Sequence, residues 1–217
     1  YRRPKLNVAK NYLSDFITLA AISGAVITPE QTITKATEIG FVWSPGEALL
    51  TFATSAEFVN EAASKANVAA ILVDSDVVLN NMERSPVPEI FVVKNARLNF
   101  FRLHNSLRSN MKFAKTLIDP SAEIHPTALI SESGVEIGAN CVVEPGVTIQ
   151  PGTFIGANSI IRAGSHIGSD ALDIKEDEHG NPLMTDHLGG VQIGENVEIG
   201  HNSVVDRSIF RQTATTI

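Results

Sequence analysis

A repeat of six residues runs through the second half of the chain and restricts its fold more than any other feature. Aliphatic residues recur without a slip at Ile137, Val143, Ile149, Ile155, Ile161 and Ile167. A series of mostly smaller residues stands two positions before them, at Val135, Cys141, Val147, Thr153, Ser159 and Ser165. In a strand, residues i and i+2 point to the same side, so each hexad directs one member of each series inward. An α-helix would instead repeat about every 3.6 residues.

Turn residues separate these hexads. The motif Ile-Gly-x-Asn occurs at residues 137–140, 155–158, 193–196 and 199–202. A period of six with Gly and Asn at the corners is typical of a triangular parallel β-helix, with three hexads and about 18 residues per coil. The repeat begins near Ile124 and resumes at Ile193 after a polar, acidic segment, residues 169–190, which we expect to form a loop. The visible hexads predict roughly four to five coils.

The first half of the chain has a different pattern. Short apolar runs at residues 33–41, 48–52, 69–73 and 90–93 predict strands, and residues 11–22, 55–66 and 95–107 predict helices. Strands that alternate with helices indicate an α/β domain. The predicted fold class is therefore mixed: a small N-terminal α/β domain, residues 1–118, followed by a β-helix of hexapeptide repeats, residues 119–217.

Charge and composition exclude several functions. Residues 1–118 have a net charge of +3 and residues 119–217 a net charge of −10, so we do not expect nucleic-acid binding. The basic residues Arg97, Arg102, Arg108, Lys112 and Lys115 lie in a stretch without acids. No apolar run approaches the roughly 18 residues of a transmembrane helix, so an integral membrane protein is not expected. The single cysteine, Cys141, is predicted to be a core residue, and the absence of a disulfide framework favours a cytoplasmic location.

Several segments together resemble one family of the hexapeptide-repeat acyltransferases. Residues 124–128 (Ile-His-Pro-Thr-Ala) open the β-helix, and residues 187–191 (His-Leu-Gly-Gly-Val) rejoin it after the loop. The most specific stretch is residues 193–200 followed by Val205-Asp206-Arg207. Over nearly the whole chain, this pattern is similar to the UDP-3-O-acylglucosamine N-acyltransferases of lipid A biosynthesis.

This resemblance implies a function and an assembly. The β-helix would be left-handed, and three copies would form a homotrimer. The enzyme would move a 3-hydroxyacyl chain from a thioester to the amine of a UDP-linked acylated glucosamine. The thioester would be carried by acyl carrier protein or coenzyme A, with no resident cofactor and no metal. The N-terminal domain would hold the UDP end of the acceptor.

The resemblance also implies site residues. Phe52 matches a family Phe that stacks on uracil, Phe58 stands where the family has the opposing Tyr, and Ser55 replaces an Asn between them. The catalytic His of the family lies in an Ile-Ala-His-Asn hexad, and His201 has the same offset in its own hexad. However, the Asp206-Arg207 match places His201 in an earlier coil, so the family base is expected beyond Ile217. The position seven residues before His201 is Gly194, without the carboxylate that partners the family His. We therefore expect little acyltransferase activity from these 217 residues.

Three alternatives stay open from the sequence. A sugar-nucleotide N-acetyltransferase that uses acetyl-CoA would share the β-helix. A metalloenzyme of the γ-carbonic anhydrase type would use His166 and His201 as zinc ligands, although Asp206 stands where a third His would be needed. An inactive fragment or a sugar-nucleotide binding module would keep the acceptor site and lack the base.

Overall fold

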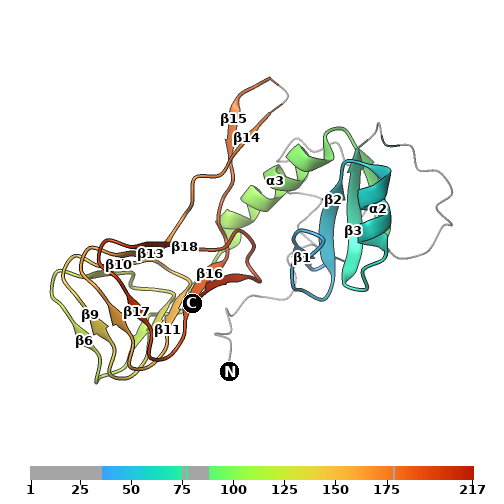
Figure 1. Ribbon diagram of the computed structural model, residues 1–217. Helices are drawn as coiled ribbons and strands as arrows, with labels where there is room; N and C mark the ends of the chain where they lie inside the picture. The colour runs from blue at the N-terminus through green and yellow to red at the C-terminus, as the bar shows by residue number, and fades with distance from the viewer. Residues whose placement is uncertain (1–35, 75–76, 78–87, 178) are drawn as a thin grey trace. The chain divides into compact units, whose positions relative to one another are not determined.

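The computed structural model describes residues 36–74, 77, 88–177 and 179–217 (Figure 1). They divide into two compact units. One unit contains residues 111–172 and 186–217, and the other contains the described residues up to Asn110 together with residues 173–185. The predicted helix at residues 11–22 lies outside the described residues. Each unit is described by itself below.

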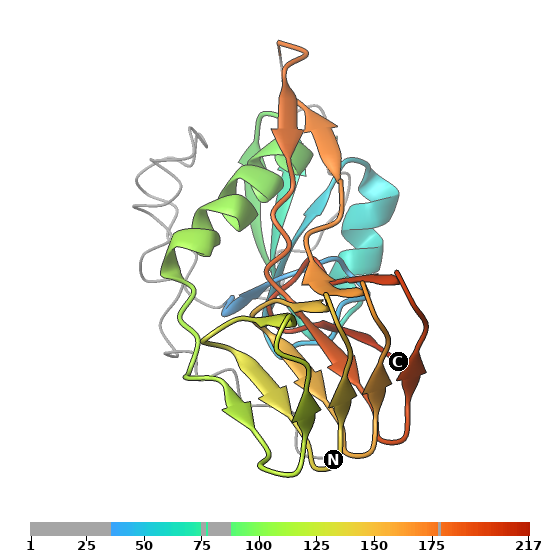
Figure 2. The same ribbon diagram turned by 90° about the vertical axis from the view of Figure 1, so that its left-hand side faces the viewer.

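The first unit is a parallel β-helix with three sheets, one on each side of a triangle (Figure 2). One sheet contains β5 (Leu117–Ile118), β8 (Val135–Ile137), β11 (Thr153–Ile155), β16 (Gly190–Ile193) and β19 (Ala214–Thr216). The second contains β6 (Glu123–Ile124), β9 (Val142–Val143), β12 (Ile160–Ile161) and β17 (Glu198–Ile199). The third contains β7 (Leu129–Ile130), β10 (Thr148–Ile149), β13 (His166–Ser169) and β18 (Val204–Asp206). All strand pairs between coils are parallel.

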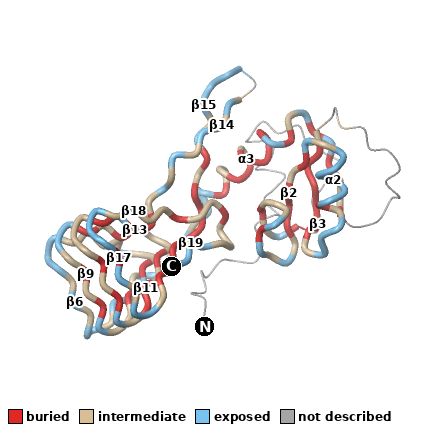
Figure 3. Tube along the Cα trace, in the orientation of Figure 1, coloured by how far each residue is buried: buried red, intermediate tan, exposed pale blue. Residues whose placement is uncertain are grey.

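The register of these pairs confirms the predicted hexads. Ile137 pairs with Ile155, and Ile155 pairs with Ile193, so one aliphatic column runs through the coils. Equivalent columns on the other two sides include Val143 beside Ile161 and Ile149 beside Ile167. The members of both predicted inward series between residues 135 and 167 are buried (Figure 3). Cys141 is among them, fully buried as predicted, and this burial raises the pKa of its thiol.

The small inward residues also connect one coil to the next. Ser159 donates its hydroxyl to the carbonyl of Gly194 at 2.9 Å, and Ser165 donates to the carbonyl of Gly200 at 2.8 Å. The Cys141 thiol approaches the carbonyl of Gly156 at 3.1 Å. Buried hydroxyls need such partners, because leaving one unsatisfied costs about 1–3 kcal/mol. Ser159 and Ser165 therefore add hydrogen bonds between coils to an interior that is otherwise mostly apolar.

The Asn residues of the Ile-Gly-x-Asn motif form corners. Asn140, Asn158, Asn196 and Asn202 all have a positive φ, between 52° and 59°. This left-handed conformation is costly for most residues, whereas Asn adopts it more readily. Asn140 also donates its side-chain amide to the Asn158 side chain, 3.2 Å away in the next coil.

Two details differ from the sequence-based expectations. Residues 111–118 lie with the β-helix, because β5 pairs with β8, so the division between the units falls before these residues. The expected loop after β13 contains a hairpin of β14 (Ile174–Glu176) and β15 (Pro182–Met184). The hexad phase is also broken before β19, and Arg211 lies in the segment between β18 and β19.

The second unit is a parallel sheet with a helix on each face. Its strands are β1 (Glu38–Ile39), β2 (Leu49–Ala53), β3 (Val68–Asp74) and β4 (Glu89–Val93), paired in that order. The helices are α2 (Ala56–Ala63) and α3 (Ala96–Ser106), and the short η1 (Leu107–Asn110) follows α3. The predicted strands at residues 48–52, 69–73 and 90–93 and the two helices that follow β2 and β4 are thus confirmed. No helix in the described residues is long and apolar enough to cross a membrane.

The corner conformation generates a stability prediction at Asn196, an exposed corner residue with φ 58°. Replacing Asn196 with Ala should lower the free energy of unfolding by about 1 kcal/mol, because Ala is strained in the left-handed region. Asn196→Gly, which removes the same side chain without that strain, is the control and should stay close to wild type. Denaturant titrations of the three proteins measure the difference, and equal losses in both variants would contradict the prediction.

Candidate functional site

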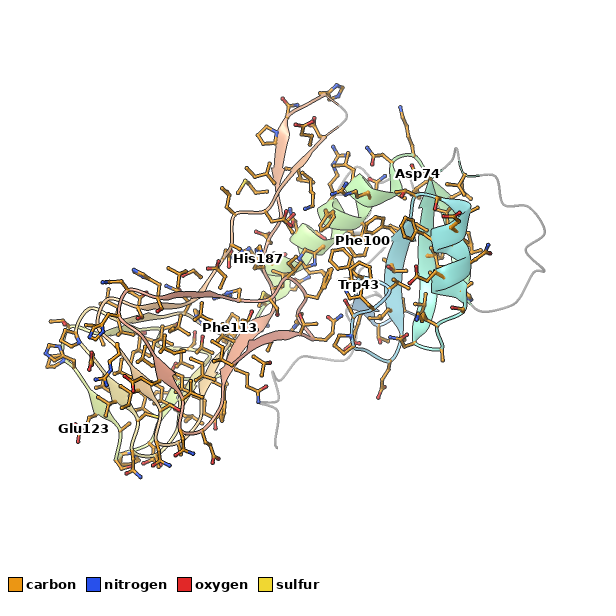
Figure 4. All side chains as sticks on the ribbon, viewed as in Figure 1. Trp43, Asp74, Phe100, Phe113, Glu123 and His187 are labelled. Carbon is orange, nitrogen blue, oxygen red and sulfur yellow. The ribbon has the colours of Figure 1, made fainter. Side chains whose placement is uncertain are left out.

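An aromatic cluster lies between the sheet and α3 in the second unit (Figure 4). The Phe52 ring centroid is 4.9 Å from that of Phe100 and 6.2 Å from that of Phe101. Phe41 joins the cluster, 6.3 Å from Phe52, and is also 5.0 Å from Trp43. Phe100 and Phe101 are buried, whereas Trp43 is 75% exposed. The cluster thus runs from the core of the unit to an indole ring that faces solvent.

Ser55 and Phe58 belong to the start of α2. Ser55 is the N-cap residue, and its hydroxyl accepts a hydrogen bond from the backbone N–H of Phe58 at 3.3 Å. This cap satisfies one of the free N–H groups of the first turn. The Phe58 side chain points outward and is 54% exposed. Ser55 therefore acts on the local backbone and fixes the position of Phe58.

The structure does not bring the rings of Phe52 and Phe58 together. Neighbouring residues of a strand point to opposite faces of the sheet. Ala53 packs with Val59 on the α2 face, and Phe52 packs with Phe100 on the α3 face. Among the described residues, no aromatic ring is paired with Phe58. Phe58 is a free stacking surface, while Phe52 is half-buried in the core cluster.

Charged side chains from three successive coils meet at one corner of the β-helix. Arg162 donates from Nη1 to Glu144 at 2.6 Å and from Nε to Glu198 at 2.7 Å. Glu144 also accepts the backbone N–H of Ala163 at 2.9 Å. These hydrogen bonds, foremost the one from Arg162, hold the pKa of Glu144 below its ordinary value of 4.5. The Arg162 guanidinium therefore connects the coil that contains Glu144 with the coil that contains Glu198.

His201 lies beside this corner. Its Nε2 is 3.6 Å from the Glu144 carboxylate, and its side chain is 65% exposed. The sequence predicted no carboxylate for His201, because Gly194 occupies the expected position. The structure provides one from Glu144, two coils earlier. The signal that could have found it is the 18-residue coil period, which stacks Glu144 below Arg162 at the same corner.

Two other histidines of the β-helix have hydrogen-bond partners of their own. On the outward side of β13, the His166 ring nitrogen Nδ1 is 2.7 Å from the Thr148 hydroxyl. His125 lies in the first coil and is hydrogen-bonded to Thr127. In the described part of the chain, no three His, Cys, Asp or Glu side chains are grouped so that they could hold a metal ion.

Comparison with known proteins identifies relatives that match a large part of the chain. A family model described as the hexapeptide repeat of succinyl-transferase matches residues 128–151. A UDP-3-O-acylglucosamine N-acyltransferase of Coxiella burnetii is 29% identical and covers 78% of this chain, and one of Bordetella pertussis is 28% identical and covers 81%. One of Helicobacter pylori is 31% identical and covers 63% of this chain. The chain spans about half the length of these relatives: 55%, 57% and 48%, respectively.

A solved structure gives a weaker match. The acetyltransferase domain of PglB from Neisseria gonorrhoeae, in complex with acetyl coenzyme A, shares 16% identity and covers 75% of this chain and 94% of its own. The TM-score is 0.17, so this match adds nothing to the sequence comparisons.

The Glu144 corner generates a prediction about pH. A carboxyl whose pKa is lowered by folding stabilises the folded state above its unfolded pKa, and this contribution is lost as the pH falls through the folded value. Glu144→Gln should therefore reduce the free energy of unfolding at pH 7, and the difference from wild type should shrink below about pH 4.5. Denaturant titrations from pH 7 to pH 3 measure it.

The control for this experiment is Glu195→Gln, which changes an exposed carboxylate at another corner of the β-helix. It should leave the pH dependence of wild type unchanged. A Glu144→Gln difference that is as large at pH 3 as at pH 7 would contradict a role for the Glu144 charge.

Proposed function

We propose that this protein is an N-acyltransferase that acts on a UDP-linked acylated glucosamine. The observation that carries the proposal is the extent of the similarity. A match over 78% of the chain is longer than the β-helix and so reaches into the α/β unit. The relatives matched there are named UDP-3-O-acylglucosamine N-acyltransferases. A general likeness among hexapeptide repeats would account only for the β-helix.

The proposed reaction forms an amide from a thioester. The neutral sugar amine attacks the thioester carbonyl, a base accepts the proton of the amine, and the C–S bond breaks to release the thiol of the carrier. The negative charge on the carbonyl oxygen of the intermediate needs a hydrogen-bond donor, for which backbone N–H groups at glycine corners are suited. No resident cofactor or metal takes part in this scheme.

Several finer features belong to the same proposal. The donor is a 3-hydroxyacyl thioester carried by acyl carrier protein, the β-helix winds with a left hand, three copies form a homotrimer, and the enzyme is cytoplasmic. What supports them is the resemblance of the residue pattern of the β-helix to this family of acyltransferases. Acetyl-CoA as donor, with a sugar-nucleotide acceptor, is the alternative that a donor assay distinguishes.

The acceptor site that we propose is centred on Phe58. A nucleobase needs an exposed aromatic face to stack on, and Phe58 offers one at the capped start of α2. Ser55 holds the backbone at that point. Phe52 lies outside this site, because its half-buried ring packs against Phe100 on the α3 face of the sheet.

Phe58→Ala tests this site without disturbing the core, because the side chain is 54% exposed. Stacking of one base contributes about 1–3 kcal/mol, so UDP should bind about tenfold more weakly or worse. Isothermal titration of UDP measures the affinity. Val92→Ala, at an apolar residue of the same unit that is 49% exposed, is the control and should bind like wild type. Equal UDP affinity of Phe58→Ala and wild type, or no UDP binding by wild type, would refute the site.

His201 is the candidate base within the described chain. The Glu144 carboxylate beside it is already engaged by Arg162, and the imidazole is 65% exposed. We therefore expect little turnover by the 217-residue chain, and any residual rate of His201→Ala to stay within about twofold of wild type. General base catalysis contributes about 10²–10⁴-fold, so a loss of that size in His201→Ala would make His201 the base. Measured UDP binding without turnover would favour the binding-module alternative.

A further inference from the structure

The hairpin of β14 and β15 (Figure 1) is a sheet of only two strands, and among the described residues neither strand pairs with any other. Each strand therefore has a second edge, and an unpaired edge is a template for a further strand. Two hydrogen bonds show which backbone groups lie inside the ribbon. The N–H of Thr185 donates to the carbonyl of Asp173 at 2.8 Å, and the N–H of Asp177 donates to the carbonyl of Asn181 at 2.9 Å.

The residues between these two bonds include those whose backbone groups point out of the ribbon. In an antiparallel ribbon, hydrogen-bonded pairs alternate with pairs whose N–H and C=O groups point away from the partner strand. Ile174 is paired with Met184 one position from the first bond. Glu176 is paired with Pro182 one position from the second. The backbone groups of Ile174 and Glu176 therefore point to the outer edge of β14, and those of the other two residues to the outer edge of β15.

The two outer edges differ in how far they are blocked. On the edge of β15, Pro182 has no N–H to offer. The carbonyl of Met184 accepts the side-chain amide of Asn105, from α3, at 2.6 Å. On the edge of β14, the N–H and C=O groups of Ile174 and Glu176 have no hydrogen-bond partner in the described part of the chain. The hairpin thus has one blocked edge and one open edge, that of β14.

Contacts with α3 determine which side chains lie beside the open edge. Lys175 lies with its ammonium 4.9 Å from the centre of the Phe101 ring and forms an ion pair with Asp173. These contacts hold one face of the hairpin against its own unit, and residues 171 to 177 alternate between partly buried and exposed. On the exposed face of β14, Ile174 is 49% exposed and Glu176 is also exposed. The open edge therefore presents one apolar and one acidic side chain to solvent.

We propose that the open edge of β14 binds an extended segment of a partner protein, which adds to the hairpin as a third strand. Side chains of neighbouring strands interact on each face of a sheet, and opposite charges are favourable there. The bound segment is therefore expected to place an apolar residue beside Ile174 and a basic residue beside Glu176.

The charge of this edge disfavours a second copy of the same strand. A second β14 would bring another Glu176 to the same small sheet, and like charges on neighbouring strands are destabilising. The occupant is thus a segment of a different protein, with apolar and basic residues on one face. This inference does not depend on the proposed acyltransferase activity, because it rests on the backbone and side chains of the hairpin alone.

The test is binding of a labelled peptide to the 217-residue chain, measured by fluorescence anisotropy. The probe is a synthetic peptide that repeats the sequence Val-Thr-Lys-Thr, so an extended chain places valine and lysine in turn on one face. The comparison peptide repeats Val-Thr-Glu-Thr. Wild type is expected to bind the lysine peptide, and to bind the glutamate peptide about fivefold more weakly.

A first pair of variants tests the backbone of the open edge. Ile174→Pro removes an N–H that points away from β15, so the hydrogen bonds of the hairpin remain. Its affinity for the lysine peptide should fall about tenfold, because a backbone hydrogen bond is lost. The matched control is Met184→Pro, which removes the N–H of the directly opposite residue, 47% exposed, from the blocked edge. This control should bind like wild type, and circular dichroism verifies that both variants are folded.

A further variant tests the charge of the bound segment. Glu176→Lys is expected to reverse the preference, so that the glutamate peptide binds more tightly than the lysine peptide. An unchanged preference would overturn the assignment of a basic segment. Binding of neither peptide by wild type, an Ile174→Pro variant that binds like wild type, or an equal loss in Met184→Pro would overturn the edge as the binding site. Self-association in sedimentation velocity that Ile174→Pro abolishes would assign the edge to a second copy and also overturn the proposal.

Discussion

Parallel pairing between coils is the constraint on which the β-helix depends. Each strand is only two to four residues long, so a strand cannot hold its own position. Its position is set by the strands above and below, which pair Ile137 with Ile155 and Ile155 with Ile193. A slip of one residue would place the aliphatic column in water and the polar outward residues in the core. The hydroxyls of Ser159 and Ser165 reinforce the register, because each reaches a carbonyl of the following coil.

The repeat made the β-helix predictable from the sequence, because in a strand the spacing between residues determines the side to which their side chains point. The corners were equally predictable, since Asn is one of the few residues that adopt the left-handed conformation. Contacts between long side chains were not predictable in this way. The hexad offset of His201 shows that it lies at a corner, but it does not show how far the Glu144 side chain extends along that corner.

The α/β unit shows another limit of sequence reasoning. Phe52 and Phe58 are close in the chain, and a family pattern suggests that they face each other. However, a strand ends and a helix begins between them, and this change directs the two side chains to different surroundings. One ring stabilises the core beside Phe100, and the other remains available to a ligand. The alternating burial of the hairpin could likewise not be foreseen, because it depends on Lys175 and Phe101, which are far apart in the sequence.

The hairpin is inserted between two coils, yet β11 and β16 pair as if nothing separated them. The entropic cost of closing a loop grows only slowly with its length. The stability of the β-helix core therefore depends little on the length of the segment inserted at this corner. A lineage of such proteins can therefore lengthen, replace or lose the segment at this corner while every buried column stays intact. Specificity and assembly can then evolve in the inserted segment, independently of the stability of the scaffold.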